Sequence, residues 1–215
     1  RALEDIGILA HKLGSQELNH IPLLENLAAM NKPVILSTGL SRFSEIEEAL
    51  DTCYRYGNKQ IALLHCVSAY PTPLEECNLN VIKTLKTVFD VPVGISDHTL
   101  DPIVVPVVAV AIGACIIEKH FTISKTLHGP DHSFALEPWE LTKMVSEVRK
   151  IEESDDQMGC VTELFGKEKV NTILGSFKKA ITPSEQVTYP NDKRSIHAVQ
   201  NIKRGSRLTR ENISV

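Results

Sequence analysis

The stretch that decides the fold has two halves, Val91-Pro92-Val93-Gly94-Ile95-Ser96-Asp97-His98-Thr99 and Ala114-Cys115-Ile116-Ile117-Glu118-Lys119-His120-Phe121. Each half is a short apolar run that ends in polar residues, which is typical of a buried strand. Residues 103–113 between them are apolar almost throughout and end in a glycine, which predicts a helix packed on a sheet. A strand, a crossover helix and a parallel strand form one βαβ unit. Both polar clusters then lie at strand ends, where functional residues of such folds gather.

Two histidines are the first candidates for a site. Side chains alternate along a strand, so Ser96 and His98 share one face, and so do Glu118 and His120. Two imidazoles from adjacent strand ends could hold one divalent metal ion. The alternative is that the two histidines are unrelated core or surface residues. The hydroxyl and the carboxylate on the same faces favour the metal interpretation.

Three earlier segments repeat this pattern of an apolar run ending in polar residues: 9–13, 33–36 and 61–64. Helices are expected between them, one of them with Ser44 as N-cap and Glu47 completing a capping box. Apolar strands without alternation are typical of a parallel sheet that is buried on both faces. Five strands cannot close a (β/α) barrel, which needs eight. Either the sheet is open and doubly wound, or three strands lie before Arg1.

The composition excludes several classes of function. The net charge is −4 and no basic block is interleaved with aromatics, which argues against nucleic acid as a partner. The longest apolar stretch is interrupted by Pro106 and Gly113, so no membrane span is expected. The five cysteines form an odd set without CxxC spacing, which favours free thiols and a cytoplasmic location. A nucleophilic cysteine remains a weaker alternative.

The chain divides into three expected regions. Residues 1–153 carry the strand–helix repeats and end in a helix after Trp139. Residues 154–192 are polar and interrupted by glycines, which indicates a connector with short helices. Residues 193–215 alternate as strands do and indicate the start of a small second domain.

Taken together and in order, the strand-end motifs closely resemble those of the sialic acid synthase family. These enzymes make nonulosonic acids from phosphoenolpyruvate and an N-acylated mannosamine-type sugar. The motifs are Lys12-Leu13-Gly14-Ser15-Gln16-Glu17, Leu36-Ser37-Thr38-Gly39, Leu64-His65-Cys66-Val67-Ser68-Ala69-Tyr70-Pro71, Gly94-Ile95-Ser96-Asp97-His98-Thr99, Ile117-Glu118-Lys119-His120-Phe121-Thr122 and Gly129-Pro130-Asp131-His132.

The resemblance implies a fold. Its members have a (β/α)8 TIM barrel, so the strands here would be the fourth to the eighth, with the first three missing. Residues from 193 onward resemble the start of the C-terminal antifreeze-like (SAF) domain of such enzymes. The resemblance also implies a homodimer in which that domain covers the barrel mouth of the partner.

The resemblance further implies a mechanism. His98 and His120 would hold a divalent metal, Mn²⁺ first and Mg²⁺ or Co²⁺ as alternatives, that polarises the aldehyde of the open-chain sugar. The methylene carbon of phosphoenolpyruvate would attack that aldehyde, water would add, and phosphate would leave with C–O cleavage. Glu17 would transfer protons, so that Glu17, His98 and His120 are the expected catalytic residues.

The remaining candidates would bind substrates. A cation and several hydroxyls suit phosphate and carboxylate oxygens, and the resemblance assigns phosphoenolpyruvate to Lys12, Ser15, Ser37, Ser68 and Ser96. It assigns the amino sugar to Glu17, Tyr70 and Asp131. Without the resemblance, the serines could equally be strand-end caps, and Tyr70 could belong to a packed turn.

Some alternatives stay open. Lys119 stands where the family frequently has Arg, which keeps the charge but loses the forked geometry. The chain could also be a catalytically silent sugar- or anion-binding module, or a different metal-dependent barrel enzyme such as a hydrolase. The acceptor could be N-acetylmannosamine, its 6-phosphate, or a diacetamido sugar that leads to legionaminic or pseudaminic acid.

Overall fold

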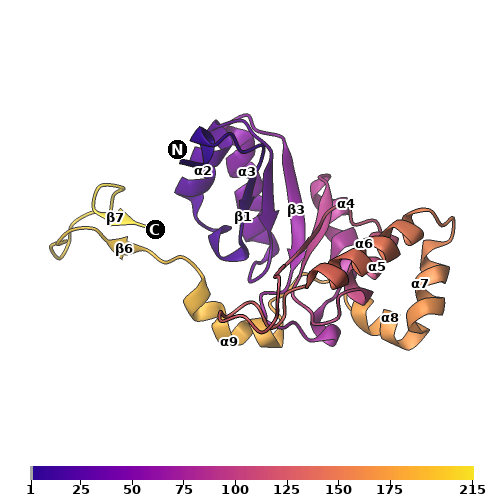
Figure 1. Cartoon of the computed structure of the whole chain (residues 1–215). Coiled ribbons are helices and arrows are strands. Elements are labelled where there is room, and N and C mark those ends of the chain that lie inside the picture. Colours follow the sequence, from indigo (N-terminus) through magenta and orange to yellow (C-terminus); the bar gives the residue numbers. More distant parts are fainter. Residues whose placement is uncertain (1) are drawn as a thin grey trace.

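The computed structural model describes residues 2–215 and is built around one parallel sheet of five strands (Figure 1). Each strand pairs with the next in chain order, which confirms the expected succession of parallel strands. Because the strands run in one direction, their carboxyl ends meet at a single edge of the sheet. The strands are β1 (His11–Leu13), β2 (Val34–Ser37), β3 (Ile61–Cys66), β4 (Val93–Asp97) and β5 (Ile117–Lys119).

Helices connect the strands and cover the sheet. In Figure 1 the helices α2 and α3 lie together on one side, and α5 to α8 gather at the opposite end of the molecule. The elements are α1 (Ala2–Asp5), η1 (Ser15–Glu17), α2 (Ile21–Ala29), α3 (Phe43–Arg55), η2 (Leu74–Glu76), α4 (Asn80–Phe89), α5 (Val104–Ala111), α6 (Pro138–Glu152), α7 (Gln157–Phe165), α8 (Lys167–Leu174) and α9 (Pro183–Asp192).

The apolar helix α5 shows why its sequence has no polar face. It packs on β4 on one side and on α6, α7 and α8 on the other, and residues 104–110 are all buried. A helix that is buried all round needs no polar stripe. Its first backbone N–H groups are satisfied by Asp101, whose Oδ1 accepts from Ile103 and Val104 at 2.9 Å each. Pro106 sits in the first turn, where a missing N–H costs little.

The expected start of α3 was wrong by two residues. The helix begins at Phe43 rather than after Ser44, and Glu45, not Glu47, reaches back to the chain. Glu45 Oε2 accepts a hydrogen bond from the backbone N–H of Arg42 at 2.8 Å. A carboxylate at the third helical position satisfies an N–H whatever the N-cap side chain is, which explains why the earlier start is stable.

The two strands that carry the histidines approach each other closely at Gly94. A Cβ built on Gly94 would lie 2.2 Å from the carbonyl oxygen of Ile116 and 2.7 Å from its Cβ. These atoms belong to the neighbouring chain segment, which is itself bonded to β4 through Ile95 N and Ile116 O at 2.9 Å. Only glycine fits at this contact without moving a strand.

The variant Gly94→Ala is therefore expected to lower the free energy of unfolding by about 1–3 kcal/mol, the usual cost of overpacking a core. Urea titration of the full-length protein followed by circular dichroism measures the change. Gly57→Ala is not a matched control, because Gly57 has a positive φ of 80°. The control is Ala62→Gly on the neighbouring strand β3, which exchanges the same two residue types in the sheet without adding a Cβ. Unchanged stability of Gly94→Ala would contradict the packing described here.

The segment after α6 is helical and packed. Helices α7 and α8 contact α5, and they add Val161, Val170 and Ile173 to the hydrophobic core. Beyond α9 the chain forms a two-stranded antiparallel sheet of β6 (His197–Ala198) and β7 (Ile213–Ser214). Figure 1 shows this small sheet standing away from the parallel sheet. The boundaries expected at residues 153 and 192 remain predictions.

Two further features bear on function. None of the helices within residues 2–215 combines the length and the apolar composition needed to cross a membrane. The five cysteines are free thiols, and Cys53, Cys66 and Cys77 are buried.

Candidate functional site

A cavity of about 350 Å³ opens at the carboxyl ends of the strands. Parallel α/β folds place their sites at this edge of the sheet. Seven of the ten residues predicted for the site line this cavity: Lys12, Ser15, Ser37, Tyr70, Ser96, His98 and His120. The other three predicted residues, Glu17, Ser68 and Asp131, lie beside it. Gln16, Cys66 and Glu118 also line the cavity, although no role was predicted for them.

The rings of the two predicted histidines lie side by side in an edge-to-face arrangement. Their ring centroids are 5.3 Å apart, and Tyr70 packs against both rings at 4.2 and 5.8 Å. The register explains this, because Ser96 pairs with Glu118 and Asp97 with Lys119, so that the next residues of the two strands come opposite each other. Metal–nitrogen bonds are about 2 Å long, so two rings at this separation can bind one ion.

His98 makes its shorter hydrogen bond through Nδ1, and its Nε2 has only a long contact with a serine hydroxyl. His98 Nδ1 donates to the carbonyl oxygen of Val67 at 2.9 Å, and His98 Nε2 lies 3.5 Å from Ser96 Oγ. His120 Nδ1 lies 3.6 Å from Asp131 Oδ2. Burial, and next the charge of His98, lower the pKa of His120 and so favour its neutral form. Neutral imidazoles whose other nitrogen is held by an oxygen are the usual form of metal ligands. The pKa of His98 shifts the other way, because burial lowers it but Cys66, Val67 and Asp97 together raise it.

The donor set can be compared with the needs of a metal ion. Within residues 2–215, no group of three or more histidine, cysteine, aspartate or glutamate side chains is arranged to hold one. The histidine pair therefore offers two protein ligands and leaves the remaining positions to water or substrate. Open positions of this kind are typical of catalytic rather than structural metal sites.

A glutamate that the predictions did not assign occupies the centre of the polar wall. Glu118 Oε2 accepts a hydrogen bond from Ser96 Oγ at 2.6 Å and lies 3.3 Å from Lys12 Nζ. The predicted anion-binding groups Lys12 and Ser96 therefore meet at one point, where a carboxylate already binds them. The sequence carried a signal for Glu118, since alternation puts it on the face of His120.

Two serines and a glycine form a tight cluster at the floor of the cavity. Ser15 Oγ accepts a hydrogen bond from Gly39 N at 2.9 Å. A Cβ on Gly39 would lie 2.3 Å from Ser68 Oγ and 2.7 Å from Ser15 Oγ, so glycine is needed here. Ser37 Oγ is buried and has no partner among the described residues. A buried hydroxyl without a partner is unusual, and in a cavity it is suited to bind a ligand.

Glu17 lies in a second cavity of about 430 Å³, which shares Gln16 with the first. Arg194 forms a fork on its carboxylate, with Nε to Oε2 at 3.1 Å and Nη2 to Oε1 at 2.6 Å. The structure therefore does not bring Glu17 to the histidine pair. It places it instead against the segment that leads into β6. Sequence reasoning could not have found this contact, because 177 residues separate the two partners.

The two other predicted residues outside the first cavity also have local partners. Ser68 is buried beneath the cavity, with its hydroxyl 3.9 Å from Cys66 Sγ. Asp131 approaches His120 as described above and is mostly exposed. Tyr70 lines the cavity as predicted, and burial, with the charge of Cys66 next, raises its pKa to about 12, so that its hydroxyl stays protonated at neutral pH.

Cys66 is the cysteine that lines the cavity. Burial raises the pKa of its thiol, but the opposing effects of His98, Ser15 and Lys179 together lower that pKa overall. A thiol next to an imidazole is the arrangement that a nucleophilic cysteine requires. The same imidazole cannot activate a thiol and bind a metal ion at once, so the two interpretations of His98 exclude each other.

A buried ion pair joins the residues that precede the two histidines on β4 and β5. Lys119 Nζ contacts Asp97 Oδ2 at 2.6 Å, and both side chains are almost fully buried, with 3% and 1% exposed. Lys119 Nζ also donates to the carbonyl oxygen of Thr99 at 2.8 Å, and Asp97 Oδ1 accepts from Thr99 N at 2.8 Å. These contacts connect β4 to β5 just before the histidines.

The fold and the cavity define a parallel α/β protein with a paired-histidine site at the strand ends. The model of the NeuB family matches residues 1–159 of the chain. The chain belongs to the NeuB family.

Relatives of known name agree with this assignment. The chain is 42% identical over 214 residues to the spore coat polysaccharide biosynthesis protein SpsE of Bacillus subtilis, covering 99% of this chain and 56% of that protein. It is 37% identical over 214 residues to the N,N'-diacetyllegionaminic acid synthase of Campylobacter jejuni, covering 99% and 58%. The crystal structure of SpsE superposes with a TM-score of 0.86 at 39% identity, over 99% of this chain and 58% of that one. The chain thus spans little more than half the length of these relatives.

Proposed function

We propose that the full-length protein is a nonulosonic acid synthase that condenses phosphoenolpyruvate with an N-acylated mannosamine-type sugar. The observation that carries the proposal is the pair of adjacent imidazoles, 5.3 Å apart, in a cavity that also holds Lys12 and three serines. Membership of the NeuB family supports it, as does the similarity to a protein named as a legionaminic acid synthase.

The proposed fold of the whole catalytic domain is a (β/α)8 barrel. The five parallel strands would be its fourth to eighth, with β1 and β5 as the edges that three further strands join. The small sheet of β6 and β7 would be the start of the C-terminal SAF domain. We further propose a homodimer in which this domain covers the barrel mouth of its partner.

His98 and His120 would hold the divalent ion of the enzyme. The residues fit this group, because the bond from His98 Nδ1 to Val67 leaves Nε2 with only a long contact to Ser96, and the two ring centroids are 5.3 Å apart. Mn²⁺ is the first candidate, with Mg²⁺ and Co²⁺ as alternatives, since a site with few protein ligands leaves room for water and substrate oxygens. When bound, such an ion supplies Lewis-acid polarisation of a carbonyl group.

The other side chains would bind and orient the substrates. Lys12 supplies a positive charge for phosphate or carboxylate, and the unpartnered hydroxyl of Ser37 supplies a further hydrogen bond. A bound anion would compete with Glu118 for Lys12 and Ser96, which frees this carboxylate within the cavity. Tyr70 keeps its proton and can donate to a sugar oxygen, and Glu17 and Asp131 would contact the amino sugar from the rim.

The proposed reaction forms one carbon–carbon bond and breaks one carbon–oxygen bond. A carbon–carbon bond forms between the methylene carbon of phosphoenolpyruvate and the aldehyde carbon of the open-chain sugar. Water adds to the neighbouring carbon, and the bond from that carbon to the phosphate oxygen breaks. The products are a nonulosonic acid and inorganic phosphate.

A coupled phosphate-release assay on the full-length protein tests the proposal. The assay contains phosphoenolpyruvate, Mn²⁺ and one acceptor from a panel of N-acetylmannosamine, its 6-phosphate and diacetamido sugars. We expect phosphate release that requires both an acceptor and the metal ion. Release without any acceptor would indicate a hydrolase instead. Metal and ligand binding without turnover on any acceptor would indicate a silent binding module.

A further inference from the structure

Glu185, in the first turn of α9, is a fully buried carboxylate with 0% of its surface exposed. Its Oε1 accepts hydrogen bonds from the backbone N–H groups of Leu40 at 2.7 Å and Ser68 at 2.9 Å. Its Oε2 accepts from Thr182 N at 3.0 Å. A buried charge is costly even when it is hydrogen-bonded. Glu185 thus closes the capping box of its own helix with Thr182 and also binds two backbone N–H groups from other parts of the chain.

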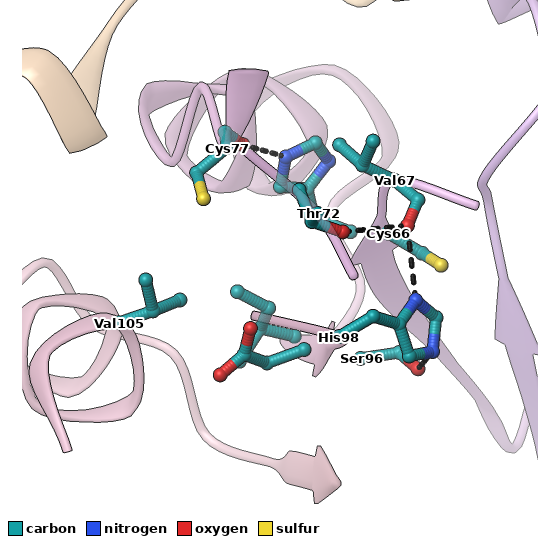
Figure 2. Close-up of a pocket in the computed structure, with 10 residues that line it drawn as sticks. Cys66, Val67, Thr72, Cys77, Ser96, His98 and Val105 are labelled. Atoms are coloured by element: carbon teal, nitrogen blue, oxygen red, sulfur yellow. Dashed lines mark hydrogen bonds between the residues drawn. The ribbon is translucent and has the colours of Figure 1, made fainter. Parts of the chain in front are cut away.

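One of these N–H groups belongs to the peptide that also binds His98. The N–H of Ser68 and the carbonyl of Val67 belong to the same peptide, so Glu185 binds one side of it and His98 the other. Val67 O accepts from His98 Nδ1 at 2.9 Å and from Thr72 Oγ1 at 3.2 Å, as Figure 2 shows. Glu185 is thus connected to the candidate metal ligand through a single peptide plane, although 87 residues of chain separate them.

This arrangement matches what a metal-binding histidine needs. Such histidines commonly donate their second N–H to a carboxylate or a backbone carbonyl, which fixes the tautomer and makes the coordinating nitrogen a better donor. A carboxylate that binds the N–H of a peptide polarises its carbonyl, because successive hydrogen bonds strengthen one another. Here the carboxylate of Glu185 binds the N–H of the peptide whose carbonyl, on Val67, accepts from the imidazole of His98.

We propose that Glu185 is a positioning residue for His98, acting through the Val67–Ser68 peptide to hold the ring with Nε2 directed to a metal ion. The inference rests on the proposed function, since it concerns the same metal site. If so, α9, which follows the five parallel strands in sequence, helps to position a residue of the site.

A simpler possibility is that Glu185 only fastens α9 to the sheet. The neighbouring residue provides a matched control for this. Ser184 fastens the same turn of α9 to η2, through Oγ to Glu76 Oε1 at 3.0 Å and N to Glu76 Oε2 at 3.1 Å. The variant Ser184→Ala loosens α9 without touching the peptide that binds His98.

The test compares Glu185→Gln with Ser184→Ala in the full-length protein, with Mn²⁺ binding measured by titration calorimetry and by the electron paramagnetic resonance signal of free Mn²⁺. We expect Glu185→Gln to weaken Mn²⁺ binding about 10-fold, the lower end of the cost of losing an outer partner of a metal ligand. Ser184→Ala should bind Mn²⁺ as the unchanged protein does.

Equal losses in both variants, or no loss in Glu185→Gln, would overturn the proposal. Absence of Mn²⁺ binding in the unchanged protein would instead overturn the proposed metal site itself. If circular dichroism shows that Glu185→Gln does not fold, Glu185→Asp is measured in the same way. Aspartate keeps the charge, but its side chain is one methylene shorter and moves the carboxylate away from Ser68 N. A loss of Mn²⁺ affinity supports the proposal, and an unchanged affinity contradicts it.

Discussion

Replacing His98 with alanine is expected to lower kcat/KM for phosphate release at least about 1,000-fold and to remove the high-affinity Mn²⁺ site. A metal that stabilises the charge developing on a carbonyl contributes several kcal/mol to the transition state, and each 1.4 kcal/mol is a factor of ten in rate. The adjacent ring of His120, 5.3 Å away, cannot hold the ion alone. His120→Ala should therefore give a loss of the same size.

The control for this prediction is another histidine. His128 is exposed and lies in the loop that follows β5. His128→Ala should keep both activity and Mn²⁺ affinity. If His98→Ala folds, binds no Mn²⁺ and yet releases phosphate at an unchanged rate, the two histidines are not the catalytic metal site.

Replacing Lys119 with methionine is expected to destabilise the full-length protein by about 3–5 kcal/mol, the usual cost of leaving one partner of a buried ion pair without the other. Asp97 has only 1% of its side chain exposed, so its charge would stay in a low-dielectric environment. The change is measured as the free energy of unfolding in urea. Because the pair connects β4 and β5 just before the histidines, Mn²⁺ binding should weaken as well.

Two further variants make this prediction specific. Lys119→Arg keeps the charge and should cost far less, since arginine can also pair with Asp97. The double variant Asp97→Asn with Lys119→Met removes both charges and should recover part of the loss, as paired replacements of buried ions do. A double variant as unstable as the sum of the single ones would show that the pair itself is not the cause.

Much of the fold follows from local sequence patterns. Apolar runs ended by polar residues indicated where the five parallel strands lie, because buried strands need no alternation. The fifth strand was misplaced, since it was expected over residues 114–117 and lies at Ile117–Lys119. The apolar segment at 103–113 was correctly predicted as a helix on the sheet. The start of α3 was misplaced, because Ser44 is a good N-cap by type while Glu45 satisfies the end of the helix from another position.

The candidate site was predicted in part, for a physical reason. Alternation along β4 and β5 placed Ser96 with His98 and Glu118 with His120, since neighbours in a strand two residues apart share a face. The resemblance assigned Glu17 to the amino sugar and to proton transfer, which stays a prediction, and the structure adds a contact with Arg194. No local pattern contains that contact, because the two residues come from distant parts of the chain.

The sequence by itself determined which strands form, which faces their side chains take, and that two imidazoles end neighbouring strands. Those properties depend on residues within a few positions of one another. Tertiary packing alone decided that Glu185 reaches the peptide behind His98 and that Lys119 is buried against Asp97. Contacts of this kind arise only when helices and strands far apart in the chain are brought together. A charged group that becomes buried needs a partner nearby in space, whatever the distance between the two in the sequence.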